Sequence, residues 1–168
     1  RAAFDEASVN DEEDVIRIIS PSLEITETVY FTSDESKSMT IIGSDERTRI
    51  GLKSFDNGAS WNTFTGLIFQ APSAEITISS VDFANLTERA GNSAISSQAK
   101  IDLDDVTAVG FTDFVILTDD NNLRATQISA SRNFRVFHLP GRTQQTINIS
   151  QSSFTDNQTV VLTTSGNG

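Results

Sequence analysis

The sequence predicts an all-β protein folded as a right-handed parallel β-helix, and two periodic strand patterns support this prediction. In the first pattern, apolar or small residues occupy positions 1, 3, 6 and 8 of segments that begin at Ile76, Ile101, Leu123 and Ile147. Successive segments begin 22–25 residues apart. If each repeat forms one coil, every strand pairs in parallel with its copies in the neighbouring coils, and the inward side chains stack.

A second set of short apolar strands has nearly the same period. These strands begin at Leu67, Ala94, Val115, Val136 and Val160. Two strand sets in phase favour a β-helix over an antiparallel β-sandwich, which is the alternative fold for a chain with many short strands. The chain has room for about seven coils, and at a strand spacing of about 4.8 Å these would form a rod roughly 35 Å long.

The N-terminal third is less regular, but it fits the same single domain, residues 1–168. The apolar residues of the segment 2–7 predict a short helix, and residues 1–14 are interpreted as a cap on the coil stack. Residues 15–66 are expected to form irregular first coils and residues 67–168 regular ones. The short strands expected in the first coils, and a turn or longer loop, fall at 15–19, 23–25, 29–31, 39–43 and 56–60.

Composition and charge exclude several classes of protein. The 168 residues include 40 Ser and Thr, one His and no Cys, and the formal net charge is −11. A disulfide scaffold and a Cys-ligated metal site are therefore excluded. A nucleic-acid partner is not expected, because phosphates require a basic surface. No apolar run exceeds about five residues, which is too short for a transmembrane helix.

Three segments resemble the pectin-lyase-like right-handed β-helix superfamily. Phe4–Ile18 is similar to its usual entry, a short amphipathic helix followed by an acidic turn and a strand, and Ser38–Gly43 resembles a strand that often ends its first coils. Phe154-Thr-Asp-Asn157 matches the F-x-x-N repeat of surface β-helices such as the chlamydial polymorphic outer-membrane proteins, with Asn133 in the equivalent slot of the preceding coil. The G-G-A-[IVL] motif of those proteins is missing.

The resemblance implies candidate chemistry on carbohydrates. Asp119-Asp120 resembles the paired aspartates of polygalacturonases, although the accompanying N-T-D, G-H-G and R-I-K segments are absent. An adjacent pair on a turn is also ordinary solvated turn chemistry. Four arginines on consecutive coils would either face an acidic sugar or balance nearby aspartates; they are Arg124, Arg132, Arg135 and Arg142, and the aspartates are Asp104, Asp105, Asp113 and Asp119.

Several single residues complete the candidates. His138 is the only imidazole, so any His-based catalytic site would be centred on it. Trp61 and Phe64 are interpreted either as a sugar-stacking or protein-contact platform or as a lid packed on the coils. Acceptor sequences for N-glycosylation occur at Asn85, Asn148 and Asn157, a number that chance also provides.

The function expected from these observations is that of a non-enzymatic extracellular or surface β-helix, a scaffold or adhesion and interaction domain. A carbohydrate-active fragment, lyase or hydrolase, is the first alternative, and a subunit that docks through its open coil end is the second. The expected partner is a protein or a second copy at the coil ends, or a polysaccharide. No cofactor or metal is expected, although the acidic turns leave calcium as an option. No closing cap is evident near residue 168, so we expect the last coil to be open, in a longer protein or an assembly.

Overall fold

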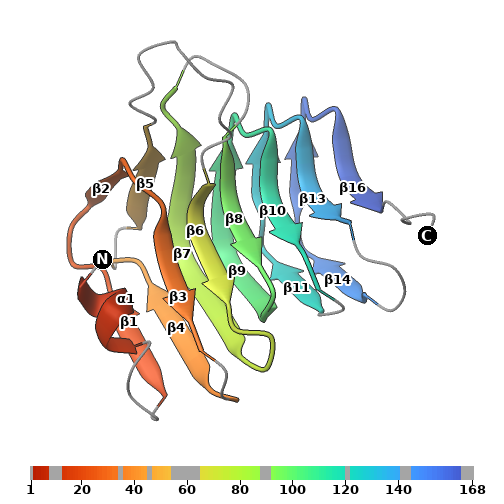
Figure 1. Ribbon diagram of the computed structural model, residues 1–168. Helices are drawn as coiled ribbons and strands as arrows, with labels where there is room; N and C mark the ends of the chain where they lie inside the picture. Colours follow the sequence, from red (N-terminus) through yellow and green to blue (C-terminus); the bar gives the residue numbers. More distant parts are fainter. Residues whose placement is uncertain are drawn as a thin grey trace, which may run out of the picture.

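The computed structural model describes residues 2–7, 13–33, 36–44, 47–53, 65–87, 92–119, 122–140 and 145–163. Within these residues the chain is a parallel β-solenoid with one short helix, which confirms the predicted all-β fold (Figure 1). The helix is α1 (Ala2–Ala7), as predicted. The strands of the first half are β1 (Asp14–Arg17), β2 (Ser22–Ile25), β3 (Val29–Thr32), β4 (Ser38–Ile42), β5 (Thr48–Leu52), β6 (Thr65–Gln70), β7 (Glu75–Asn85) and β8 (Ser93–Ser97). Those of the second half are β9 (Lys100–Val109), β10 (Asp113–Leu117), β11 (Leu123–Thr126), β12 (Ser129–Ser131), β13 (Arg135–Leu139), β14 (Ile147–Ser150), β15 (Ser153–Thr155) and β16 (Thr159–Thr163).

Two parallel sheets form the walls of the solenoid. The third strand of each coil belongs to a six-stranded sheet, in the order β16-β13-β10-β8-β6-β3. The other strands form a ten-stranded sheet. In this sheet the long strand β7 pairs with both β4 and β5 of the preceding coil, and the long strand β9 pairs with both β11 and β12 of the following coil. We number the coils 1 to 6 by their strands β3, β6, β8, β10, β13 and β16. The colours of Figure 1 therefore follow the stack from one end to the other.

The number of coils is smaller than predicted. In the described part of the chain, six strand levels correspond to about five full turns instead of about seven, so the described stack measures about 24 Å from the first strand to the last. The cause is the length of coil 2. Ser38 pairs with Glu75, a step of 37 residues, whereas Ile76 pairs with Ile101 and Leu123 with Ile147 at the predicted period. The predicted turn at 56–60 lies outside the described residues.

The first predicted repeat is correct in register, and a backbone bend explains its unequal spacing. Ile76, Ile101, Leu123 and Ile147 pair from coil to coil. The fifth residue of each segment has a positive φ of 50–56°, which bends the strand between its two halves; these residues are Ser80, Asp105, Gln127 and Gln151. Positions 4 and 5 therefore both lie at a bend, and this is why the inward positions are three residues apart there.

The second predicted repeat exists, but its register was wrong by one residue at three strands. The column that pairs from coil to coil consists of Leu67, Ile95, Val115, Phe137 and Val161. The predicted starts Ala94, Val136 and Val160 each precede these residues by one. Ala94 and Val136 are fully buried, as are Ile95 and Phe137 next to them. Hydrophobicity alone therefore does not distinguish the two registers.

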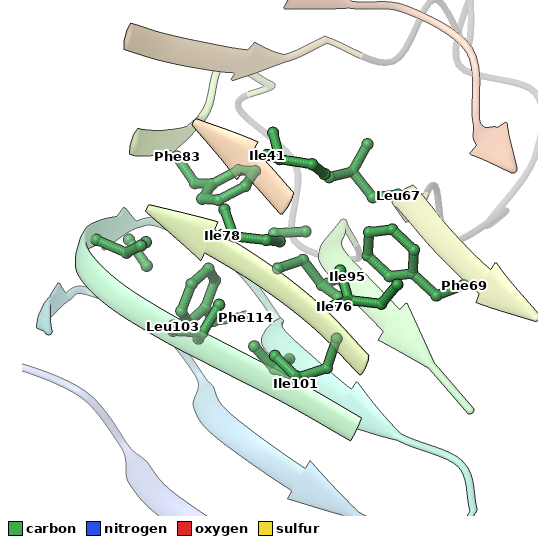
Figure 2. Close-up of a cluster of buried hydrophobic side chains, with 14 of the residues drawn as sticks. Ile41, Leu67, Phe69, Ile76, Ile78, Phe83, Ile95, Ile101, Leu103 and Phe114 are labelled. Atoms are coloured by element: carbon green, nitrogen blue, oxygen red, sulfur yellow. The ribbon is translucent and has the colours of Figure 1, made fainter. Parts of the chain in front are cut away.

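Apolar side chains from the two sheets meet inside the solenoid (Figure 2). Isoleucines of the ten-stranded sheet, such as Ile76 and Ile78, are completely buried. Phenylalanines connect successive coils, since Phe114 lies 5.7 Å from Phe83 and 6.4 Å from Phe137 between ring centroids. The coils are thus held together by continuous packing along the axis.

Helix α1 packs against the first two coils, β3 of coil 1 and Phe69 on β6 of coil 2. The Phe4 ring lies 6.4 Å from the Phe69 ring, and the Lys37 ammonium donates a hydrogen bond of 2.7 Å to the carbonyl of Ala7. A small apolar cavity of about 190 Å³ lies beside Phe4, lined also by Ile25 and Leu67. Within the described residues α1 is the only helix, and its six residues are too few to cross a membrane.

Asparagine side chains join the last coils. Asn133, which is 2 % exposed, accepts a hydrogen bond of 2.9 Å from the Phe111 N–H and donates one of 3.1 Å to the Ala108 carbonyl. Asn157 accepts from the backbone and side-chain N–H groups of Asn133, at 2.9 Å each, and donates to the Ala130 carbonyl. The equivalent positions 133 and 157 therefore form an asparagine ladder, in which each side chain hydrogen-bonds to polar groups of the preceding coil.

Candidate functional site

Two of the sequence-predicted residues, Arg135 and His138, come together on the six-stranded sheet around Asp113. Asp113 opens β10, and it pairs directly with Arg135, the first residue of β13 on the next coil. His138 follows three residues later on β13. The neighbouring strands place the apolar residues Ile116 and Leu162 in register with His138 on either side.

The carboxylate of Asp113 lies against both the guanidinium of Arg135 and the imidazole of His138. The Arg135 Nη2 donates to Oδ2 at 2.7 Å, the Arg135 Nε lies 2.5 Å from Oδ1, and the His138 Nδ1 lies 3.4 Å from the same Oδ1. The side chain of Asp113 is 5 % exposed, compared with 23 % for Arg135 and 17 % for His138. Asp113 is thus a buried carboxylate whose charge is compensated by the Arg135 guanidinium through one hydrogen bond and a close ion pair.

Burial lowers the pKa of His138 below its ordinary value. The Asp113 carboxylate opposes this shift and the Arg135 guanidinium adds to it. The imidazole is therefore favoured in its neutral form, which is the form that can accept a proton. A carboxylate–imidazole pair resembles two members of a hydrolytic triad, but the residues in register with His138, Ile116 and Leu162, carry no hydroxyl group to serve as a nucleophile.

The other predicted chemistry residues are dispersed. Arg124 on β11 is 65 % exposed, and its Nη1 lies 3.6 Å from Oδ2 of Asp102 on the neighbouring strand β9. Asp119 follows β10, where its backbone carbonyl accepts a hydrogen bond of 2.5 Å from Gln145. Both lie apart from the Asp113 cluster in the fold. Four of the predicted residues fall outside the described residues; they are Asp120, Arg142, Trp61 and Phe64.

The three predicted glycosylation asparagines differ in their surroundings. Asn85 donates to the Gly110 carbonyl at 2.9 Å and accepts from Thr87 and from Asn92. Asn157 belongs to the asparagine ladder. Asn148 is exposed on β14. Modification at any of them stays a prediction, and Asn148 has the most accessible side chain of the three.

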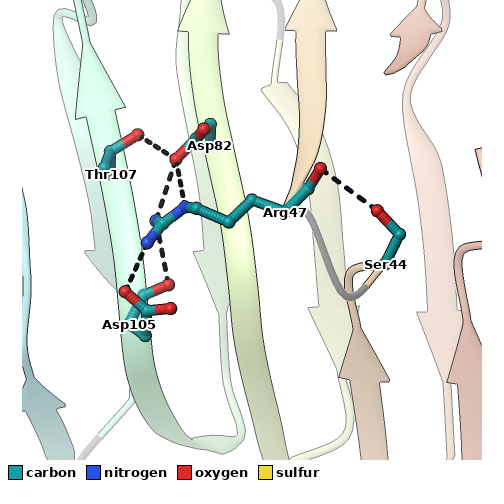
Figure 3. A network of polar contacts seen from close by, with 5 residues as sticks. All are labelled: Ser44, Arg47, Asp82, Asp105 and Thr107. Atoms are coloured by element: carbon teal, nitrogen blue, oxygen red, sulfur yellow. Dashed lines mark hydrogen bonds and ion pairs between the residues drawn. The ribbon is translucent and has the colours of Figure 1, made fainter. Parts of the chain in front are cut away.

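An arginine that the sequence did not single out connects three coils (Figure 3). Arg47 precedes β5 on coil 2, and its Nε donates to Asp82 Oδ1 on coil 3 at 2.9 Å. Its two Nη groups reach the Oδ1 and the backbone carbonyl of Asp105 on coil 4. Thr107 also donates to Asp82, at 2.6 Å. No local motif marks Arg47, because its partners lie 35 and 58 residues away.

The last coil forms the second candidate site. Its strands β14, β15 and β16 each pair on one side only within the described residues. Inward positions that are fully buried on coil 5 are exposed here: Ala125 is 0 % exposed and Ile149 36 %, and Phe137 is 1 % exposed and Val161 39 %. The described segment 145–163 contains a single charged residue, Asp156. Within the described residues, the last coil therefore has strand edges and apolar inward positions that no other described strand covers.

The described residues also contain a polar recess of about 350 Å³, lined by Lys37, Glu75 and Lys100 among others. Lys100 is paired there with Glu75 at 2.8 Å. No three His, Asp or Glu side chains gather in a metal-binding arrangement within the described ranges. Calcium binding therefore stays a prediction that this geometry does not test.

Comparison with known proteins gives no family assignment. No protein-family model, curated protein or solved structure matches the chain.

Proposed function

We propose that this domain is a non-enzymatic scaffold and interaction module of the extracellular or cell-surface type. In this proposal the domain contacts its partner through the surface that the last described coil, β14 to β16, presents. The observation that carries it is the change in exposure between coils 5 and 6. Inward side chains that are buried on every middle coil are more than one-third exposed at Ile149 and Val161. Exposed apolar surface next to unpaired strand edges is typical of an interaction site.

The kinship with pectin-lyase-like proteins belongs to the same proposal. A parallel β-solenoid with an N-terminal helix fits that superfamily, and the asparagine ladder fits the F-x-x-N repeat of surface β-helices. A fold of this kind carries many functions, however, and so the function is argued from the coil end.

A carbohydrate-active β-helix is the second candidate, and one specific observation favours it. The Asp113–His138 pair holds a neutral imidazole on a sheet surface, and Arg135 adds a cation next to it. Cleavage of an acidic polysaccharide by elimination needs a base, and His138 is the residue that would serve here. Arg135 would then have to bind the sugar acid while it is already paired with Asp113, which argues against this role.

The two candidates are separated by incubating the purified 168-residue chain with polygalacturonate and with alginate, with and without calcium. We expect neither new reducing ends nor the ultraviolet absorbance of unsaturated products. Cleavage by the wild-type chain would overturn the non-enzymatic proposal. Loss of that cleavage in His138→Ala, with retention in Arg124→Ala, would place the activity at the Asp113 cluster, because Arg124 lies outside it and is 65 % exposed.

A further inference from the structure

The polar recess on the outside of the ten-stranded sheet is a separate site, away from the last coil and from the Asp113 cluster. Its volume is about 350 Å³. Three lining residues pair in register from coil to coil, each as the first residue of its strand: Ser38 on β4, Glu75 on β7 and Lys100 on β9. The residue after each of them is buried in the core, so this column of three faces outward.

Backbone hydrogen bonds between coils fix the wall of the recess. The Glu75 N–H donates to the Lys37 carbonyl at 3.0 Å, and the Lys100 N–H donates to the Ala74 carbonyl at 3.1 Å. The Ala74 N–H closes the preceding turn by donating to the Ala71 carbonyl at 3.0 Å. The recess is therefore preformed, which lowers the entropic cost of binding a ligand there.

Charges of both signs line this recess. Within the described residues they are Glu13, Lys37, Glu75 and Lys100, which include two of the three lysines of the chain. Lys37 is 8 % exposed, and its ammonium donates to the Ala7 carbonyl at 2.7 Å. Three hydroxyl groups add to the polar lining, those of Ser36, Ser38 and Ser73. In a chain with a net charge of −11, the recess thus combines carboxylates with a local concentration of lysine.

Glu75 and Lys100 form an ion pair that a ligand can reach. The Lys100 Nζ lies 2.8 Å from the Glu75 Oε1, and the two side chains are 44 % and 43 % exposed. A carboxylate accepts several hydrogen bonds and an ammonium donates several, so this single contact leaves capacity on both groups. The pair therefore offers an acceptor and a donor side by side at the recess.

We propose that the recess binds a small zwitterion, the ammonium and carboxylate of a free amino acid or a dipeptide. The ligand ammonium lies against Glu75 and Glu13, and the ligand carboxylate lies against Lys100. An anion would meet two carboxylates and the field of an acidic chain, whereas a cation would meet two lysines. The volume is near the lower limit of ligand pockets and fits a molecule of this size. This site is independent of the coil-end contact in the proposed function.

The test is titration of the isotope-labelled 168-residue chain at neutral pH with three probes, followed by amide chemical shifts. L-Alanyl-L-alanine carries both charges, its N-acetyl derivative carries only the carboxylate, and its C-terminal amide carries only the ammonium. We expect the zwitterion to bind most tightly and to shift the amide signals of Ser38, Glu75 and Lys100, but not those of β14–β16. No binding of the zwitterion, equal or tighter binding of a singly charged probe, or shifts only elsewhere would each overturn the proposal.

Two variants that remove one charge each locate the site. Lys100→Gln and Glu75→Gln should each weaken zwitterion binding by about tenfold, because each removes a charge-assisted hydrogen bond. An exposed ion pair contributes little to stability, so both variants should fold, and circular dichroism verifies this. The matched control Lys53→Gln removes an exposed lysine that is not among the described lining residues, and it should bind like the wild type. Equal affinities of Lys100→Gln and Lys53→Gln would refute the site.

A change in probe preference separates contact with the ligand from an effect on the wall. Glu75→Gln removes a carboxylate, so it should discriminate less against the N-acetyl probe. Lys100→Gln removes an ammonium, so it should discriminate less against the amide probe. A variant that only loosens the wall would lower the affinity for all three probes alike, and such a uniform loss would contradict the proposed recognition.

Discussion

The guanidinium of Arg47 on coil 2 donates hydrogen bonds to both the carboxylate and the backbone carbonyl of Asp105, which lies two coils further along the stack. Strand pairing in a solenoid connects each coil only with its immediate neighbours. Arg47 thus adds a connection between coils that do not pair directly, and it bonds to Asp82 on the coil between them.

We expect Arg47→Met to lower the free energy of unfolding by about 1–2 kcal/mol, because it removes charge-assisted hydrogen bonds from groups that are still partly solvated. For a chain of this size the melting temperature should fall by roughly 2–8 °C. Thermal denaturation followed by circular dichroism measures this change. The control is Arg49→Met on the exposed face of β5, which should have little effect. Equal effects of the two variants would show that the Arg47 bridge is not stabilising.

The two cross-strand Arg–Asp pairs should differ strongly in their contributions. Removing Arg135 leaves Asp113, whose side chain is 5 % exposed, without its guanidinium, and a buried charge that loses its partner costs about 3–5 kcal/mol. Removing Arg124 disrupts a pair at 3.6 Å in which the arginine is 65 % exposed, and this should cost less than about 1 kcal/mol. Urea denaturation of Arg135→Ala and Arg124→Ala compares them. Similar midpoints would contradict the assignment of Asp113 as a buried, compensated carboxylate.

The stabilising effect of the asparagine ladder should require both the oxygen and the NH2 group of the Asn133 side chain. Asn133→Ala leaves the buried N–H of Phe111 and the carbonyl of Ala108 without their partners, which costs about 2–4 kcal/mol in total. Asn133→Asp keeps the acceptor but removes the donor to Ala108 and Asn157, so it should not restore stability. Asn148→Ala on the exposed face of β14 is the control. Chemical denaturation is the measurement, and a neutral Asn133→Ala would refute the role of the ladder.

Stability should decrease as the pH falls through the titration of His138. Burial lowers the native pKa of His138, whereas the unfolded chain titrates near pH 6.5. Between these two values the unfolded state binds more protons, so the free energy of unfolding falls as the pH is lowered through this window and is unaffected by this group above it. His138→Gln should remove this part of the pH dependence. Denaturation at pH 5, 6, 7 and 8 tests it, and an unchanged slope in the variant would contradict the burial of the imidazole.

Much of the fold could be predicted from local sequence. The repeat that starts at Ile76, Ile101, Leu123 and Ile147 has two inward positions on each side of a bend, and this pattern recurs on coils 3 to 6, so the register of this part of the ten-stranded sheet follows directly. In the six-stranded sheet two adjacent positions are both buried, as at Val136 and Phe137, and the pattern is compatible with two registers. Coil 2 is 37 residues long, so a count based on a period of about 24 residues predicts more than one coil in this segment.

Local sequence identified some residues of the candidate sites, but it did not show which of them lie together. His138 and Arg135 were noted as residue types, and Asp113 was noted as one of several possible charge partners. These three side chains meet because Asp113 on coil 4 pairs with Arg135 on the adjacent coil 5.

By itself, the sequence determined the class of architecture, the N-terminal helix and the acidic, cysteine-free surface, because these depend on composition and on a period within one coil. Only the tertiary structure decided the number of coils, the Arg47 bridge, the Asp113 cluster and the uncovered positions Ile149 and Val161. The physical reason is that each of these is a contact between coils. Residues that pair along the axis are separated by 20 residues or more in the chain, and a shift of one residue in register replaces the whole set of contacts.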